Sequence, residues 1–242
     1  MKKHIPNIIT CCNLLCGAVA IVCAFAGAYA SAFLFILLGA CFDFGDGATA
    51  RKLGVSGPMG VELDSLADDI TFGLAPALIL FRFLFPAIGW WALIALLMAA
   101  FSAVRLAKFN IDSRQHENFI GLATPANAIF WASIATLPLF PHMHEAVVTP
   151  GEPYVEIALP WVLLVLSLVS CWLMVSEISF FSLKFKSLGW SENRWRYIFL
   201  GGCVLIIAFC VAIALQMGHP TYILAAGAAC IAWYVIMNLC IK

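Results

Sequence analysis

Apolar stretches of bilayer-spanning length follow one another along almost the whole sequence, separated by short breaks rich in glycine, proline or charge. About 20 apolar residues in a helix cross the hydrocarbon core of a membrane, and a helix satisfies its backbone hydrogen bonds without water. The composition agrees, because 64% of the residues are hydrophobic and 11% are charged, whereas soluble domains are about half apolar and about a quarter charged. The sequence therefore predicts an all-α, polytopic membrane protein.

Breaks in the apolar pattern divide the chain into eight expected spans, which form a single transmembrane domain over residues 1–242. The spans are expected at roughly residues 7–27, 31–51, 60–81, 87–108, 122–141, 155–175, 197–216 and 221–241. No soluble domain or repeat is visible between them. The formal net charge is zero, so no basic field argues for nucleic acid as a partner.

Lysine and arginine are distributed very unevenly across these eight spans. One face of the membrane would hold Lys2, Lys3, Arg51, Lys52, Arg105, Lys108, Arg114, Lys184, Lys186, Arg194, Arg196 and Lys242. The other face would hold only Arg82. Because positive residues concentrate on the cytoplasmic side, we expect both termini in the cytoplasm and the protein in the cytoplasmic (inner) membrane.

Four aspartates lie near the adjoining ends of the second and third expected spans: Asp43, Asp46, Asp64 and Asp68. A carboxylate at membrane depth costs a few kcal/mol, so it usually faces a cavity, a partner or an ion. Spacings of three and four residues place each pair on one helical face, and a short loop makes the two helices antiparallel neighbours. We therefore expect the four carboxylates to form one cluster, at the cytoplasmic end of a polar cavity.

Four carboxylates cannot share such a space in ionised form without a cation. An all-oxygen cluster suits Mg²⁺ or Mn²⁺, and Mg²⁺ held by a few carboxylates commonly completes its shell with water and substrate phosphate. Gly47 and Ala50 would form a bare strip for a nucleotide, and Arg51 is placed to bind a phosphate by charge-assisted hydrogen bonds. The alternatives are a cation-transport site and glycines that serve helix packing alone.

Two further sets of polar residues are candidates for ligand binding. Asn7, Thr10 and Asn13 recur along one side of the first span, where they would contact the nucleotide or hydrogen-bond a neighbouring helix. A second set ends the fourth span or follows it closely, where it would bind an acceptor or, for its cations, anchor the span in the cytoplasm. Its members are Arg105, Lys108, Asn110 and Thr124.

The aspartates belong to a longer pattern that resembles the signature of the CDP-alcohol phosphotransferase family. Its eight fixed positions over 26 residues are Asp43, Asp46, Gly47, Ala50, Arg51, Gly60, Asp64 and Asp68. The resemblance implies that Asp43, Asp46 and Asp64 coordinate metal ions bridging a diphosphate, with Asp68 completing the site and acting as general base. It also implies that Gly47, Ala50 and Arg51 line the nucleotide, and that Gly60 allows close approach of the third span.

The flanking sequence is similar to one branch of that family, the membrane-type phosphatidylserine synthases. The similarity lies in residues 6–17, 63–76, 105–110 and 119–126, with Lys108 where arginine is commoner and Ala123 where proline is common. It implies CDP-diacylglycerol and L-serine as substrates, a metal-dependent single displacement that releases CMP, and a homodimer. The alternatives are a sibling transferase that uses glycerol phosphate or inositol phosphate, and a divalent-cation transporter.

Overall fold

The computed structural model describes residues 4–55, 57–112, 119–137, 154–181 and 189–240. Its helices are α1 (Ile5–Phe25), α2 (Tyr29–Leu53), α3 (Pro58–Asp68), η2 (Asp69–Leu74), α4 (Ala75–Ile88), η3 (Gly89–Leu96), α5 (Leu97–Ile111), α6 (Thr124–Ile134), α7 (Tyr154–Val175), α8 (Trp190–Met217), η5 (Pro220–Ile223) and α9 (Ala225–Cys240). The strands are β1 (Phe119–Ile120) and β2 (Ser179–Phe180). Lys2, Lys3, Arg114, Lys184, Lys186 and Lys242, used above for orientation, lie outside the described residues.

The prediction of an all-α protein built from membrane-length helices is confirmed. Among the described residues, six helical stretches are long and apolar enough to cross a membrane. They are Ile5–Phe25, Tyr29–Leu53, Pro58–Ile111, Ala158–Val175, Asn193–Met217 and Pro220–Cys240.

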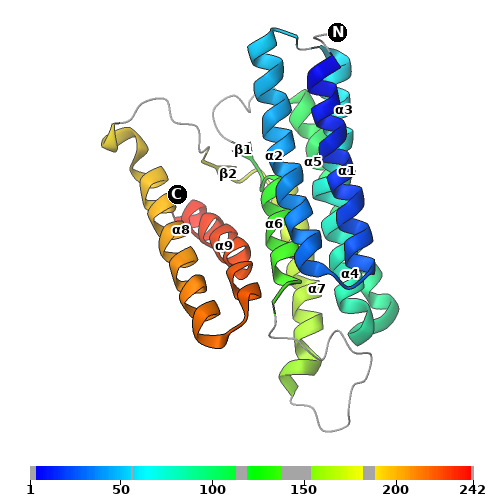
Figure 1. The fold of residues 1–242 in the computed structure, drawn as a ribbon, viewed down its shortest axis with the longest axis vertical. Coiled ribbons are helices and arrows are strands. Elements are labelled where there is room, and N and C mark those ends of the chain that lie inside the picture. Colours follow the sequence, from blue (N-terminus) through cyan, green and yellow to red (C-terminus); the bar gives the residue numbers. More distant parts are fainter. Residues whose placement is uncertain (1–3, 56, 113–118, 138–153, 182–188, 241–242) are drawn as a thin grey trace.

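The third stretch has 54 residues and reverses direction, because Gly89 adopts a φ of 58° that favours glycine. Figure 1 shows α4 running to the lower end of the bundle and α5 returning beside it. The expected fifth span corresponds to α6, of which 11 helical residues are described. The count of eight spans remains a prediction.

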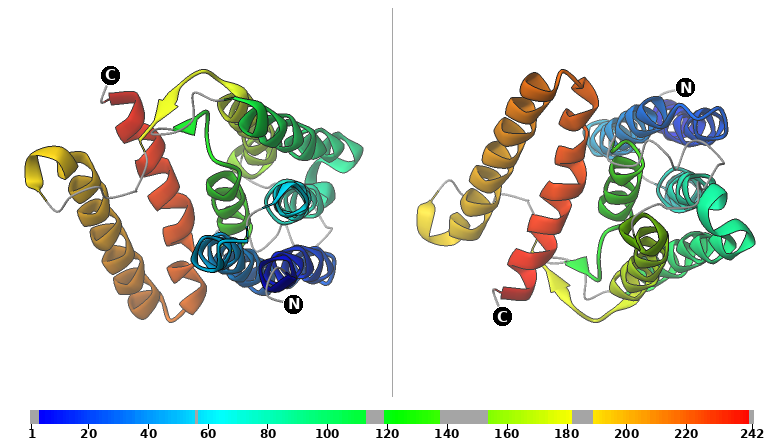
Figure 2. Two further views of the ribbon diagram at one scale, coloured as in Figure 1. Left: turned by 90° about the horizontal axis from the view of Figure 1, so that it is seen from above. Right: turned by 90° about the horizontal axis from the view of Figure 1, so that it is seen from below.

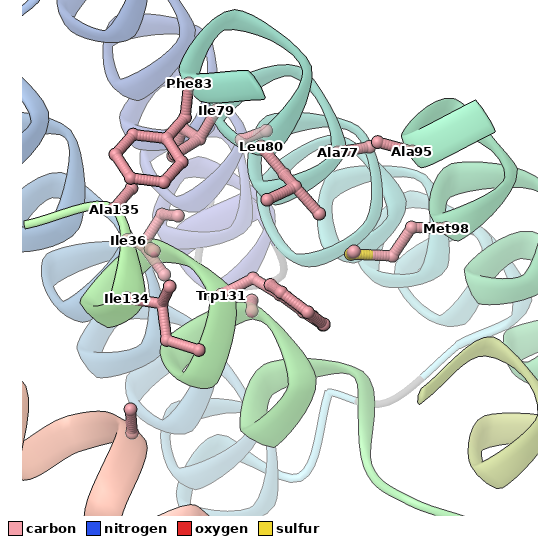
Figure 3. Packing of buried hydrophobic residues seen from close by; sticks show 14 of the residues in the cluster. Ile36, Ala77, Ile79, Leu80, Phe83, Ala95, Met98, Trp131, Ile134 and Ala135 are labelled. Carbon is pink, nitrogen blue, oxygen red and sulfur yellow. The ribbon is translucent and has the colours of Figure 1, made fainter. Parts of the chain in front are cut away.

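The helices form a bundle with the hairpin of α8 and α9 at one side (Figures 1 and 2). α1 packs along α2 and also along α3, and α6 packs against α2, α4 and α9. The core is apolar and draws on several helices: Figure 3 shows Ile36, Leu80, Phe83, Met98 and Trp131 gathered around one interior region. Trp131 is fully buried and donates its indole N–H to Ser170 Oγ at 3.0 Å, so α6 is also tied to α7.

A π-helical turn, η2, directly follows the aspartate-bearing helix α3. It is held against the first two helices by Thr71, whose hydroxyl donates to the backbone oxygen of Asn13 at 2.9 Å. Glycines make this close approach possible: a Cβ on Gly17 would lie 2.5 Å from Thr71 Oγ1, and one on Gly39 would lie 2.7 Å from Thr71 Cγ2. Single π-turns within α-helices occur frequently at functional sites.

A short antiparallel ladder joins two connections that the sequence left as loops. Strand β1 pairs with β2, with Ile120 opposite Ser179. The pairing continues as Gly121 N–H donates to the Ile178 carbonyl at 2.9 Å, and Leu122 N–H to the Leu173 carbonyl at 3.0 Å. The segment before α6 is thereby fixed to the segment after α7.

Candidate active site

Three of the four expected aspartates meet in space. Asp43 comes from α2, and Asp64 and Asp68 come from α3; one carboxylate oxygen of each lies within 4.8 Å of the others. The helix between them is α1, which packs against both α2 and α3 and carries no acidic residue. Three of the four predicted carboxylates therefore converge, and they do so across α1, although the sequence predicted that their two helices are direct neighbours.

Asp46 is buried beside this trio and is held by a separate contact. Thr10 Oγ1 donates a 2.6 Å hydrogen bond to Asp46 Oδ2, and the Asp46 side chain is 5% exposed. Asp46 remains in electrostatic contact with Asp43 and Asp64. The structure therefore places Asp46 next to the three-carboxylate group, with one of its oxygens already engaged by α1.

Asn13 makes the corresponding contact to the last aspartate of the signature. Its side-chain amide donates to Asp68 Oδ1 at 3.0 Å, while its own Oδ1 is buried without a partner. Asn7 lies at the start of the same stripe. A Cβ added to Gly60 would lie 3.7 Å from Asn7 Oδ1, so Asn7 faces α3. The polar stripe of α1 thus faces the signature helices, and Thr10 and Asn13 hydrogen-bond them.

The glycine-rich part of the signature lies on α2 beside Arg51. A Cβ on Gly47 would lie 3.3 Å from Arg51 Nη1, so the missing side chain makes room for the guanidinium. Arg51 and Ala50 belong to the last turns of α2, and Arg51 is exposed. This geometry keeps the arginine over the same helix that carries Asp43 and Asp46.

The three-carboxylate group has the chemistry of a divalent-cation site. Its donors are all oxygen, and Asp64 Oδ1 is buried with no hydrogen-bond partner. Mg²⁺ binds oxygen at about 2.0–2.1 Å, so two oxygens on one ion lie about 3–4 Å apart, close to the spacing present here. Asp43, Asp64 and Asp68 could therefore hold a divalent metal ion with little rearrangement.

A cavity of about 330 Å³ lies at the end of α5 on the side of α7. Its charged lining residues are Arg105 and Lys108 from α5 with Asp112 and Glu177 from the segments that follow α5 and α7. Arg105 is 7% exposed, and its Nε is buried without a hydrogen-bond partner. The helix that carries Arg105 and Lys108, α5, packs against η2, which begins directly after Asp68.

The other two residues of the expected acceptor set lie elsewhere. Asn110 Nδ2 donates to Ser65 Oγ at 2.8 Å, which joins the end of α5 to α3 one residue from Asp64. Thr124 begins α6, is fully buried, and has an unpartnered hydroxyl. Neither residue lines the mixed-charge cavity.

The sequence did not predict residues whose role comes from contacts between segments far apart in the chain. Thr71 hydrogen-bonds the backbone oxygen of Asn13. Only its position three residues after Asp68 pointed to it in the sequence. Ser176 and Glu177 lie in a stretch expected to be a loop, yet they form one wall of the mixed-charge cavity. The polar and acidic side chains at the start of that loop were the available signal.

Comparison with known proteins agrees with this site. The family model described as CDP-alcohol phosphatidyltransferase matches residues 3–173, which include α1 to α6 and all four aspartates. The chain is similar to proteins named CDP-diacylglycerol–serine O-phosphatidyltransferase. The Bacillus subtilis protein is 42% identical over 126 residues, which is 51% of this chain and 70% of that protein.

Two further relatives with the same name are matched over less of their length. The Helicobacter pylori protein is 34% identical over 129 residues, covering 51% of this chain and 54% of the relative. The Mycobacterium bovis protein is 33% identical over 144 residues, covering 56% of this chain and 50% of the relative. The chain thus spans about half the length of these two relatives. Because the family model covers well over half of the chain and contains the carboxylate site, the chain belongs to the CDP-alcohol phosphatidyltransferase family.

Proposed function

We propose that this protein transfers the phosphatidyl group of CDP-diacylglycerol to L-serine and releases phosphatidylserine and CMP. The observation that carries the proposal is the mixed-charge cavity on α5, the helix that packs against η2 directly after Asp68 of the three-carboxylate group. Serine carries an ammonium and a carboxylate, so it matches a cavity with both Arg105 and Glu177 in its lining. The names of the bacterial relatives support the same donor and acceptor.

The donor diphosphate would bind at the aspartates together with a metal ion, Mg²⁺ or Mn²⁺. Asp43, Asp64 and Asp68 would hold the ion, with Asp46 beside them. When bound, such an ion neutralises charge on the diphosphate and on the leaving group. Gly47, Ala50, Arg51 and Gly60 would line the nucleotide and its phosphates. Asn7, Thr10 and Asn13 would complete this binding surface from α1 and fix the orientation of the carboxylates.

Asp68 would act as the general base. Asn13 donates to Oδ1 of Asp68 and so fixes the rotation of the carboxylate that would take a proton from the serine hydroxyl. The serine oxygen forms a bond to the phosphorus that carries diacylglycerol, the bond from that phosphorus to the CMP oxygen breaks, and CMP leaves. Most of the rate would come from positioning and electrostatic stabilisation, as in phosphoryl transfer generally.

The acceptor would occupy the mixed-charge cavity, with its carboxylate on Arg105 and Lys108. Asn110 and Thr124 would support the acceptor site from outside the cavity. Asn110 ties α5 to α3, and Thr124 lies at the buried start of α6. Two cations balanced by two acids suit a zwitterion better than a dianionic phosphate. This balance favours serine over the glycerol phosphate or inositol phosphate of a sibling transferase.

The membrane setting completes the proposal. Eight spans would place both termini and the opening of the polar cavity in the cytoplasm, in the inner membrane, with CDP-diacylglycerol entering laterally from the bilayer. The protein would act as a homodimer. The uneven distribution of lysine and arginine supports this orientation.

The test is CMP release by the purified protein in mixed micelles that contain CDP-diacylglycerol. With Mg²⁺ or Mn²⁺ we expect release on addition of L-serine and only background release with glycerol 3-phosphate, inositol or inositol phosphate. Release with glycerol 3-phosphate but not with serine would show a sibling transferase. Metal-dependent cation flux in proteoliposomes without any CMP release would show a transporter instead.

A further inference from the structure

The mixed-charge cavity has a wall that lies beyond the part of the chain matched by the family model. The match ends at residue 173, and Met174, Val175, Ser176 and Glu177 all line the cavity. These residues lead directly into strand β2 (Ser179–Phe180). This wall therefore belongs to the part of the chain that follows the family match.

The last helix, α9, binds both backbone groups of the residue after β2. The Phe181 N–H donates to Asn238 Oδ1 at 2.8 Å, and the Tyr234 hydroxyl donates to the Phe181 carbonyl at 2.8 Å. Asn238 is in turn oriented by its own donation to the Tyr234 backbone oxygen at 2.7 Å. Tyr234 and Asn238 are one helical turn apart, so both can hydrogen-bond the backbone of Phe181 at once.

Aromatic packing makes this contact a buried one. The Tyr234 ring lies 5.2 Å from the Phe181 ring and 5.6 Å from the Phe180 ring, centroid to centroid. Phe199 of α8 contacts the same tyrosine at 5.5 Å. Asn238 and Phe180 are almost completely buried. The two hydrogen bonds to Phe181 are part-buried, and hydrogen bonds in a low-dielectric interior are stronger than in water and fix geometry.

The short β ladder connects Phe181 to the cavity. β2 pairs with β1, whose Ile120 lines the cavity, and the Ile178 carbonyl accepts from Gly121 N–H. On the other side, Lys108 Nζ donates to the Val175 carbonyl at 3.4 Å. The segment from Val175 to Phe181 is thus attached to α5 at one end and to α9 at the other, with Glu177 between the two attachments.

We propose that Tyr234 and Asn238 are positioning residues for the acceptor cavity, acting through the backbone of Phe181 to set the place of Ser176 and Glu177. The inference rests on the proposed function in one respect, the assignment of this cavity to the acceptor. The α8–α9 hairpin, outside the family match, then contributes to acceptor affinity without touching the acceptor.

The kinetic test compares Tyr234→Phe and Asn238→Leu with the wild type, using Tyr222→Phe as the control. Tyr222 lies in η5, outside α9 and 12 residues before Tyr234. Losing one buried hydrogen bond changes an equilibrium by about three- to tenfold. We therefore expect the KM for L-serine to rise by that factor in each variant, with kcat and the KM for CDP-diacylglycerol within about twofold of wild type. An equal rise in both KM values, or a fall in kcat alone, would overturn the proposal.

Amide hydrogen exchange tests the same contact without any acceptor. Peptides that contain residues 119–122 and 174–181 should exchange faster in both variants than in Tyr222→Phe, while peptides from α1 and α3 should be unchanged. Unchanged exchange in 174–181 would show that α9 does not position this segment. The wild type could fail to release CMP with L-serine while the variants still lose protection as expected. That result would refute the acceptor assignment and leave the structural role of Tyr234 and Asn238 intact.

Discussion

Asn13 and Asp68 are 55 residues apart in the sequence, and the side-chain amide of Asn13 donates a 3.0 Å hydrogen bond to Oδ1 of Asp68. The backbone oxygen of Asn13 is itself held by Thr71, three residues beyond Asp68. One residue of α1 therefore contacts the chain on both sides of the junction between α3 and η2. This arrangement fixes the orientation of the Asp68 carboxylate.

Replacing Asn13 tests this relationship. Asn13→Leu removes the donor and leaves the carboxylate free to rotate, so we expect kcat to fall by about 10- to 100-fold, the usual effect of losing a residue that orients a metal or catalytic group. Binding of CDP-diacylglycerol should weaken much less. CMP release under saturating substrate measures the first, and competition with a labelled donor measures the second. Cys11→Ala, on the exposed side of α1, should behave as wild type; equal activity of Asn13→Leu would contradict the role given to Asn13.

Asp68 and Asp46 should differ when each is changed to asparagine. Asp68→Asn removes the proposed base, so turnover should fall by at least about 100-fold while donor binding is partly retained. Asp46→Asn removes charge next to the trio and should weaken Mn²⁺ binding as well. Calorimetric titration with Mn²⁺ separates the two effects. Near-normal turnover of Asp68→Asn at saturating substrate would exclude Asp68 as the base.

The two cations of the mixed-charge cavity should affect the acceptor more than the donor. Arg105→Ala and Lys108→Ala each remove one partner of a carboxylate, and such a bond to a charged group contributes about 1.5–3 kcal/mol. We expect the KM for L-serine to rise about tenfold or more, with a smaller change for CDP-diacylglycerol. Arg194→Ala is the control, since Arg194 stacks on Trp195 in α8 and lines no part of that cavity. A selective rise in the lipid KM would move these cations to the donor site.

Two glycines on neighbouring helices allow a matched test of packing. Gly17→Ala would place its Cβ 2.5 Å from Thr71 Oγ1 and 2.7 Å from the Thr71 Cα, and such overpacking costs about 1–3 kcal/mol. Gly45→Ala meets no atom nearer than 3.8 Å and should be neutral or slightly stabilising. Thermal unfolding in detergent should show a lower midpoint for Gly17→Ala only. Equal midpoints would mean that α1 and η2 separate easily.

Part of the carboxylate group could be predicted from the sequence, because the spacing within each helix is local. Asp64 and Asp68 share a helical face by their spacing, and the cost of burying charge made a common cavity with Asp43 the simplest expectation. Arg105 and Lys108 were likewise found together because they lie three residues apart on one helix.

The contacts between distant segments could not be predicted in this way. The pairing of Thr10 with Asp46, and the link from Asn110 to Ser65, depend on crossing points of helices that no periodicity specifies. Asn110 looked like an acceptor ligand because it stands beside Lys108, but its amide reaches α3 instead. Strands β1 and β2 have two residues each, too few to show the alternation of polar and apolar residues that predicts a strand.

The π-turn between α3 and α4 has a consequence for the register of this part of the chain. A π-turn holds about one residue more than an α-turn, and each residue of an α-helix advances by about 100°. The face that carries Asp64 and Asp68 is therefore out of phase with α4 by about one residue. An alignment or redesign that assumed one unbroken helical period would assign the wrong side of the helix to every residue after Leu74. Removing a single residue from Asp69–Leu74 would let α3 and α4 join as one regular α-helix, with Phe83 and the rest of the core side of α4 still facing the interior but without the π-turn that brings Thr71 to Asn13.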